Sequence, residues 1–237
     1  DSVEFAINNT NSPVEIRISS EYIGKGDTDP VPEFTDTVAA GTTVVSFRGL
    51  QPNTTYYYVM RSICNNGYSD WSTPAFFNTR CVAAEIPYTN DFENVANTRC
   101  WSLVGVEGSS LEYSNEQSHT GSGSMKVYSG TAVTPLFNVT TLSNAMITGY
   151  AYSDQEESSS FSIGLMIDVN DVSTFESLQT IVVPQGGQWV EFTAYLDTLL
   201  YDTDLSEWMT APYIALATGA GNTFYYDDIT VEVIPSC

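Results

Sequence analysis

Short runs in which apolar and polar residues alternate recur along the whole chain. They are rich in β-branched and aromatic residues and are bounded by Gly, Asn, Asp, Ser or Pro; clear examples are 14–18, 55–60, 161–167 and 229–233. This period of two is typical of half-buried strands, and helical periodicity is almost absent. Many short strands separated by turns predict an all-β fold built from β-sandwiches.

The acidic and basic residues divide the chain into two parts. Residues 1–81 carry nine acidic and five basic side chains, whereas residues 82–237 carry 20 acidic side chains and only two basic ones. The change coincides with residues 79–87, a segment with the composition of a linker. We therefore predict two domains, residues 1–80 and residues 81–237, each of them a β-sandwich.

The composition excludes several classes of function. The chain has 237 residues and a net charge of −22, with seven Lys and Arg against 29 Asp and Glu. Nucleic acids and anionic membrane surfaces are bound through clustered basic side chains, so neither is an expected partner. No apolar run approaches the length of about 18 residues that spans a bilayer, so we expect no membrane insertion. The start at Asp1, without Met or a signal peptide, indicates a mature or trimmed piece.

Two motifs in the first domain are specific. Leu50–Tyr56 has the spacing L-x-P-x-T-x-Y, and Gly67–Ser72 precedes a short apolar strand. Both resemble fibronectin type III domains, in which the tyrosine forms a tyrosine corner. The resemblance implies that the Tyr56 hydroxyl bonds back to the preceding turn. Residues 1–7 resemble the second strand of that fold, so strand A is expected to be missing.

The second domain carries a series of weaker motifs whose order and spacing are informative. They lie at residues 87–93, 100–101, 118–125, 187–190, 192–197 and 225–231. Together they resemble the cleaved-adhesin, or choice-of-anchor J, domains of bacterial surface proteins, which are relatives of MAM domains. The resemblance implies a jelly roll that is secreted or displayed on a bacterial cell surface, as a monomer within a longer multidomain chain.

Four cysteines permit three complete sets of pairings, and an extracellular chain favours bridges. The predicted strands place Cys64 and Cys81 at opposite ends of antiparallel neighbours, roughly 25 Å apart, which is too far for a bridge. We therefore predict a disulfide between Cys81 and Cys100. Cys64 and Cys237 would then pair with neighbouring modules, or Cys64 is a buried thiol.

Asp227 is the strongest candidate for a metal ligand. It shares the register of the apolar residues Ile229, Val231 and Val233, which places it toward the core, and the domain offers almost no basic partner. A single bulge would exchange the directions of Asp227 and Asp228, so either can be the inward residue. A bound Ca²⁺ ion would supply the missing positive charge through oxygen ligands. Alternatively, the carboxyl group is protonated or accepts hydrogen bonds from backbone N–H groups.

The family resemblance implies the same ion, because relatives tie the first and last strands of the domain together through one calcium. By position, the candidate ligands are Glu93 and Asp227, then Asp91 and Asp228, and then the backbone carbonyls around His119 and Gly121. The expected cofactor is therefore a structural Ca²⁺ ion.

No catalytic set is recognisable in the sequence. A serine or cysteine hydrolase needs a base, and the only histidine, His119, lies in a Ser- and Gly-rich turn with no nucleophile motif nearby. The paired carboxylates of a glycosidase are not marked by any local pattern. We therefore expect a protein that is not an enzyme.

The four tryptophans are candidates for contacts with sugars, which stack their C–H faces on exposed rings. Trp101 and Trp189 fall where relatives have core aromatic residues, and Trp71 is expected to pack on its own sandwich. Trp208, with Tyr201 nearby in sequence, lies in the least regular segment. These two residues are the predicted ligand contacts.

The predicted function is non-catalytic binding of a glycan or an extracellular protein by a secreted or surface-exposed adhesin that calcium stabilises. A binding site on the loops at one end of the jelly roll is expected. Two alternatives stay open. The chain is a spacer or stalk that positions a distant domain, or it is the accessory module of a larger secreted hydrolase.

Overall fold

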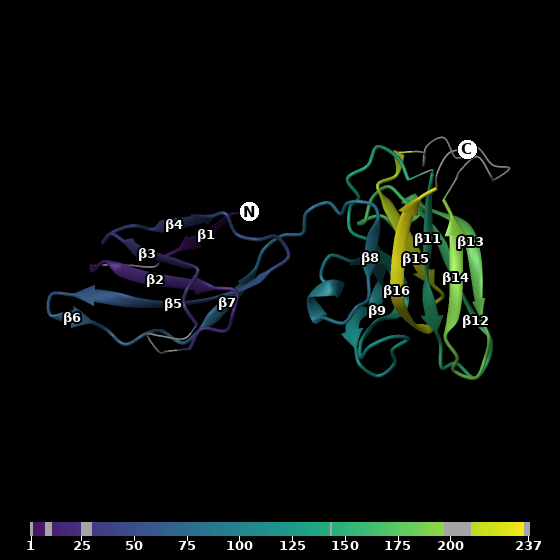
Figure 1. The fold of residues 1–237 in the computed structure, drawn as a ribbon, viewed down its shortest axis with the longest axis horizontal. Coiled ribbons are helices and arrows are strands. Elements are labelled where there is room, and N and C mark those ends of the chain that lie inside the picture. Colours follow the sequence, from purple (N-terminus) through teal and green to yellow (C-terminus); the bar gives the residue numbers. More distant parts are fainter. Residues whose placement is uncertain (1, 8–10, 25–29, 143, 197–209, 235–237) are drawn as a thin grey trace. The chain divides into compact units, whose positions relative to one another are not determined.

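The computed structural model describes the whole chain except residues 1, 8–10, 25–29, 143, 197–209 and 235–237. The chain folds into two compact units, Asp1–Cys81 (unit 1) and Val82–Cys237 (unit 2). In the described residues the regular elements are strands, apart from two short 3-10 helices (Figure 1). The predicted all-β fold is therefore confirmed. None of the helices described is long and apolar enough to cross a membrane.

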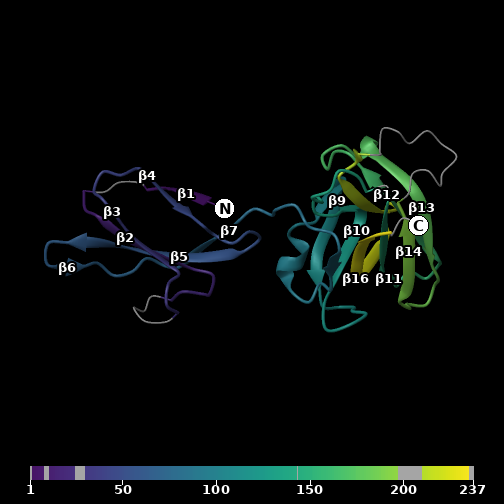
Figure 2. The same ribbon diagram turned by 45° about the horizontal axis from the view of Figure 1, so that its top comes forward.

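Unit 1 is built from two sheets. In the first, β1 (Ser2–Ala6) pairs with β4 (Val44–Arg48). The second has β5 (Thr55–Cys64) at its centre, with β2 (Val14–Ser19) and then β3 (Phe34–Val38) on one edge and β6 (Gly67–Tyr68) and β7 (Ala75–Asn78) on the other. All pairs are antiparallel, and both sheets can be followed in Figure 2.

The core of unit 1 lies between these sheets, because alternate residues of β2 and β5 face inward. Its buried members are Ile7, Val14, Ile16, Ile18, Val38, Phe47, Leu50 and Tyr56. The hydroxyl of Tyr56 accepts a hydrogen bond from the backbone N–H of Gln51, at 3.0 Å. The predicted bond from Tyr56 to the preceding turn is therefore present.

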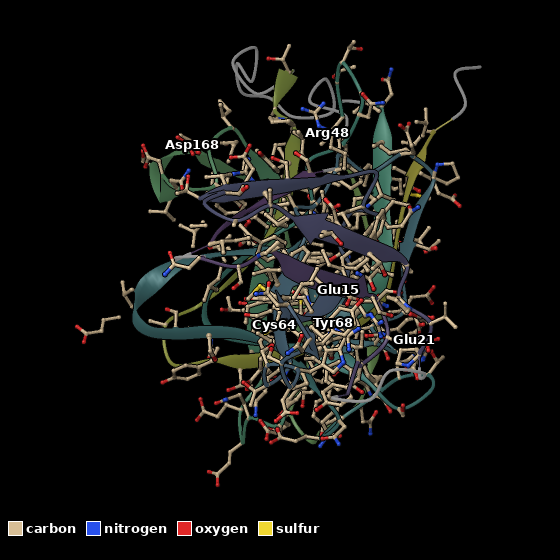
Figure 3. The ribbon with its side chains drawn as sticks, turned by 90° about the vertical axis from the view of Figure 1, so that its left-hand side faces the viewer. Glu15, Glu21, Arg48, Cys64, Tyr68 and Asp168 are labelled. Atoms are coloured by element: carbon tan, nitrogen blue, oxygen red, sulfur yellow. The ribbon has the colours of Figure 1, made fainter. Side chains whose placement is uncertain are left out.

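A charged cluster covers the opposite face of the second sheet. Glu15 of β2 accepts hydrogen bonds from Arg17 Nε at 3.0 Å and from Arg61 Nε at 2.8 Å. The guanidinium carbons of the two arginines lie 4.5 and 4.2 Å from the ring centre of Trp71. Trp71 is buried, so its predicted packing on its own sandwich is confirmed. Glu15 and Tyr68, whose ring lies against Arg61, are labelled in Figure 3.

Unit 2 is a nine-stranded antiparallel sheet that folds over on itself as a sandwich. Along the path β13-β12-β15-β10-β16-β11-β14, β8 also pairs with β16 and β9 with β10. The strands are β8 (Tyr88–Asn90), β9 (Ser102–Ser114), β10 (Ser124–Val133), β11 (Ala145–Tyr152), β12 (Ser159–Met166), β13 (Phe175–Val183), β14 (Val190–Tyr195), β15 (Tyr213–Thr218) and β16 (Thr223–Val233). The 3-10 helices are η1 (Val95–Thr98) and η2 (Val172–Thr174).

The sheet turns at β10. Residues 125–128 of this strand pair with β16, residues 131–133 pair with β15, and the register with β9 shifts between the two stretches. The two halves therefore face one another across an apolar core. The ring of Phe161 on β12 lies 5.4 Å from that of Phe192 on β14 and 5.1 Å from that of Tyr226 on β16.

Along β16 the core-facing residues change from even-numbered to odd-numbered positions near the middle of the strand. Tyr226 and Ile229 both belong to the core, although residues on one face of a regular strand are an even number of positions apart. The reason is a β-bulge at Asp228, whose φ of 50° breaks the ladder between the pairs Thr148–Thr230 and Tyr150–Asp227. The predicted direction of Asp227, on the same face as Ile229, is therefore wrong, because the extra residue moves it to the opposite face. Its predicted burial is confirmed, since Asp227 is fully buried.

Candidate functional site

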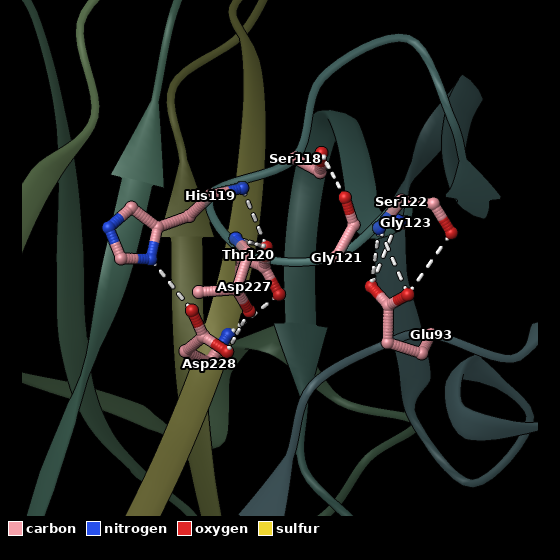
Figure 4. A network of polar contacts seen from close by, with 9 residues as sticks. All are labelled: Glu93, Ser118, His119, Thr120, Gly121, Ser122, Gly123, Asp227 and Asp228. Atoms are coloured by element: carbon pink, nitrogen blue, oxygen red, sulfur yellow. Dashed lines mark hydrogen bonds and ion pairs between the residues drawn. The ribbon is translucent and has the colours of Figure 1, made fainter.

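Three carboxylates from the two ends of unit 2 hold one loop, residues 118–123, between β9 and β10 (Figure 4). Glu93 follows β8, the first strand of the unit, and Asp227 and Asp228 lie on β16, the last. The loop presents backbone N–H groups to Glu93 and Asp227, so this part of the fold is fixed by contacts between residues far apart in sequence.

Glu93 holds the second half of the loop. Its carboxylate accepts hydrogen bonds from the backbone N–H groups of Ser122 at 2.9 Å and Gly123 at 3.1 Å, and from the Ser122 hydroxyl at 3.1 Å. These bonds, led by that from Ser122, lower the pKa of Glu93. Gly121 lies directly under the carboxylate, with a φ of 54°, and a Cβ there would be 2.2 Å from the Glu93 Cδ. Any other residue here would have to adopt a left-handed backbone and displace the Glu93 carboxylate from its hydrogen bonds.

Asp227 holds the first half of the loop and is fully buried. Its Oδ2 accepts hydrogen bonds from the backbone N–H groups of His119 at 2.7 Å and Thr120 at 3.2 Å, while its Oδ1 accepts one from Asp228 at 2.8 Å. Burial raises the pKa of Asp227 and outweighs the opposite effect of the N–H bonds. The alternative that backbone N–H groups satisfy this carboxylate is therefore observed.

Asp228 fixes the side chain of the only histidine. Its Oδ2 lies 2.7 Å from His119 Nδ1, and its Oδ1 accepts a hydrogen bond from the Thr120 hydroxyl at 2.7 Å. The His119 ring then stacks on Tyr150, with ring centres 3.5 Å apart and planes 12° apart. The carboxylates thus position an aromatic side chain as well as the loop backbone.

Four rings, which we call the aromatic shelf, lie together on the face of the sheet that is turned away from the core. They are His119, Tyr150, Tyr152 and Trp189, and each is half-buried. Trp189 lies 5.8 Å from the His119 ring and 5.5 Å from the Tyr152 ring, centre to centre. Tyr150 and Tyr152 face outward because Gly149 and Ala151 take the inward positions of β11.

An open hollow of about 530 Å³ adjoins the shelf at Tyr152. Its lining residues are Tyr152, Asp154, Gln155, Glu156, Gln185, Gly186 and Gly187. Tyr152 is the last residue of β11, and the others come from the connection after β11 and the connection before β14. The hollow therefore combines one wall of aromatic carbon with several carboxylate and amide groups.

The structure brings together most of the predicted calcium ligands but not all of them. Glu93, Asp227, Asp228, His119 and Gly121 all belong to the network in Figure 4. Asp91 does not, because its Oδ1 accepts hydrogen bonds from Glu93 N and Asn97 Nδ2. Among the described residues, no group of three or more His, Cys, Asp or Glu side chains is placed to hold a metal ion.

The tryptophans and Tyr201, which were considered as ligand contacts, differ in where the structure places them. Trp208 and Tyr201 lie outside the described residues. Trp101 is buried in the core, as predicted, but Trp189 is not a core residue. It lies on the outer face because the turn that precedes β14 carries it onto Tyr152. The alternation of tyrosines at 150 and 152 was the only sequence signal for this surface.

Three of the four cysteines lie in the described residues, and the predicted bonding is observed for Cys81 and Cys100. Cys81 and Cys100 are both disulfide-bonded. Cys64, at the end of β5, is free and exposed, so the alternative of a buried thiol is wrong (Figure 3). Cys237 lies outside the described residues.

No protein-family model and no curated protein sequence matches the chain. Among solved structures, the K1 cleaved adhesin domain of Lys-gingipain from Porphyromonas gingivalis W83 has 14% identity and a TM-score of 0.48, and the match covers 62% of this chain and 98% of that one. The CBM22-1 xylan-binding domain of Paenibacillus barcinonensis Xyn10C has 14% identity and a TM-score of 0.43, covering 65% and 100%. The tandem CBM22-1–CBM22-2 domain of the same protein has 12% identity and a TM-score of 0.46, covering 97% and 76%.

Proposed function

We propose that unit 2 is a non-catalytic module that binds glycans and that the aromatic shelf and the hollow form its contact surface. The observation that carries the proposal is the group of half-buried rings on the outer face of the sheet, next to a hollow with polar walls. Large rings that pack on one another but remain accessible offer flat apolar area at low cost in conformational entropy.

The chemistry of both surfaces suits a pyranose ring. Its C–H face stacks on an aromatic side chain, while its hydroxyl groups need acceptors and donors at the rim. Trp189 and Tyr152 supply adjoining rings. The side chains of Asp154, Gln155 and Gln185 supply oxygens and amide N–H groups in the hollow.

The Trp189→Ala variant tests the proposal on an array of neutral and charged glycans, followed by titration calorimetry with the best ligand. Wild-type protein is expected to bind, and the variant to bind about tenfold or more weakly, because truncation of a central aromatic contact costs roughly 1.4 kcal/mol or more, and 1.4 kcal/mol is a factor of ten in affinity. Tyr22→Ala, which removes an exposed ring of unit 1, is the matched control and is expected to bind normally.

Two results would count against this function. If wild-type protein binds no glycan on the array, the module is better described as a spacer. If glycan binding is unchanged in Trp189→Ala and in Tyr152→Ala, binding takes place somewhere other than the shelf.

We also propose a structural Ca²⁺ ion at the 118–123 loop. Carboxylate oxygens of Glu93 and Asp227 are hard ligands of the kind that calcium prefers, and Asp227 is buried against N–H groups with no cationic side chain among its described contacts. Their oxygens already accept hydrogen bonds, so the ion would use remaining lone pairs together with loop carbonyls.

Calcium removal gives a direct readout. Addition of Ca²⁺ at 100 times its Kd is expected to stabilise unit 2 by about 2.7 kcal/mol, and EDTA is expected to lower the melting temperature correspondingly. A melting temperature that is equal in Ca²⁺ and EDTA, together with no metal in elemental analysis of protein purified without chelator, would remove calcium from the proposal and leave glycan binding intact.

The remaining parts of the proposal concern the fold type of unit 1 and the cellular compartment in which the protein acts. The Tyr56–Gln51 hydrogen bond supports a fibronectin type III-like module that presents unit 2. The disulfide-bonded state of Cys81 and Cys100 supports an oxidising, extracellular compartment.

A further inference from the structure

The charged side chains that line the hollow are carboxylates, and further carboxylates border the shelf. Asp154 and Glu156 line the hollow and are exposed. Glu191 on β14 is the direct cross-strand neighbour of Tyr150, so the two side chains lie on the same face. Asp228 contacts the His119 ring on the other side. Carboxylates therefore border the proposed contact surface at both ends.

Few basic side chains offset this charge. Unit 2 contains only two Lys or Arg residues, Arg99 and Lys126, and its one histidine, His119, is hydrogen-bonded to Asp228. Lys126 donates a hydrogen bond to Glu116 Oε2 at 2.5 Å, and its Nζ lies 5.4 Å from the ring centre of Tyr225. Glu116 also accepts a hydrogen bond from the Tyr225 hydroxyl. Lys126 lies near the shelf, because the ring centre of Tyr225 is 5.8 Å from that of Tyr152, but it is paired with Glu116. Neither Lys126 nor Arg99 lines the hollow.

Coulomb repulsion between these carboxylates and a negative group on a ligand makes acidic glycans bind more weakly than neutral ones. A negative group on a ligand, placed about 5–8 Å from one exposed carboxylate, loses roughly two- to fourfold in affinity at low ionic strength. Two such carboxylates make the loss about tenfold. The effect is screened by salt, because the Debye length falls from about 10 Å at 0.1 M to about 3 Å at 1 M.

We infer that the hollow selects glycans without negative charge, and rejects uronate-containing, sialylated and sulfated chains. This inference rests on the proposed glycan binding and adds the chemical class of the ligand. The stacking surface recognises the sugar ring, while the carboxylates of the hollow discriminate on charge.

The test compares glycans that share a backbone and differ in charge. We would use β-mannan with polymannuronate and a β-glucan with its C6-oxidised form, each at about 50 mM and about 1 M NaCl. The neutral member of any pair that binds is expected to bind about tenfold more tightly at the lower salt concentration, and the difference is expected to shrink at the higher one.

A double variant tests whether the carboxylates of the hollow cause the preference for neutral glycans. Asp154→Asn with Glu156→Gln is expected to reduce the tenfold ratio between neutral and acidic partners to about two- or threefold at low salt. The control, Glu107→Gln with Glu176→Gln, makes the same change in net charge outside the shelf and the hollow and is expected to keep the ratio.

The outcomes separate the two levels of the proposal. If none of the glycans binds, the glycan-binding function itself fails. If the acidic chains bind as tightly as the neutral ones, or if the double variant leaves the ratio unchanged, the charge selectivity is wrong while the glycan-binding function stands.

Discussion

Replacement of Asp227 by alanine is expected to lower the free energy of unfolding of unit 2 by about 3–5 kcal/mol. The side chain is fully buried and accepts hydrogen bonds from three backbone N–H groups, those of His119, Thr120 and Asp228. Each buried donor left without an acceptor costs about 1–3 kcal/mol. Alanine also leaves a small cavity, so the loss exceeds that of an ordinary surface change.

Urea unfolding of the full chain, followed by near-UV circular dichroism, gives the measurement. Asp227→Asn keeps the shape and one oxygen but places an amide group against an N–H donor, so an intermediate loss of about 1–3 kcal/mol is expected. Glu107→Ala, an exposed acidic position, is the control and is expected to stay within about 0.5 kcal/mol of wild type. A loss below about 1 kcal/mol for Asp227→Ala would show that the loop does not depend on this carboxylate.

The same variant connects stability to the proposed function. His119 reaches the aromatic shelf from the loop that Asp227 holds, and its ring stacks on Tyr150. When the loop is released, the shelf is expected to lose His119 while Tyr152 and Trp189 remain in contact. Glycan affinity should therefore fall less in Asp227→Ala than in Trp189→Ala, measured below the unfolding transition of each variant.

Alternation along the sequence predicted the strands well, because burial on one face leaves a clear period of two. The runs at 14–18, 55–60, 161–167 and 229–233 all lie within or nearly within observed strands. Alternation alone does not say where a bulge interrupts it. The extra residue at Asp228 reverses the inward face of β16, and this decides the direction of Asp227.

The candidate site was harder to predict because it depends on which of the two faces of β11 packs into the core. Tyr150 and Tyr152 alternate with Gly149 and Ala151, and by hydrophobicity the tyrosines are the better core residues. The structure packs the small residues inward because large side chains from other strands meet them; a Cβ on Gly149 would lie 2.9 Å from Phe192. Such complementarity between distant segments is not visible in a local pattern.

A second large effect is expected in unit 1, where Glu15→Ala should lower the free energy of unfolding by about 3–5 kcal/mol. The Glu15 side chain is 10% exposed and bridges Arg17 and Arg61, which are 16% and 12% exposed. Unlike Asp227, it is compensated by cations, so its removal leaves two poorly hydrated guanidinium groups without the carboxylate between them. Both also stack on Trp71.

The fluorescence of Trp71, the single tryptophan of residues 1–81, reports unfolding of this unit when the signal of a Trp71→Phe variant is subtracted. Glu21→Ala removes an exposed acidic side chain of the same unit and is expected to have little effect. Replacing Glu15, Arg17 and Arg61 together by apolar residues should restore much of the stability, because the cost lies in poorly hydrated guanidinium groups that have lost this carboxylate. If Glu15→Ala and the triple variant are equally unstable, packing around Trp71 rather than charge pairing stabilises this face.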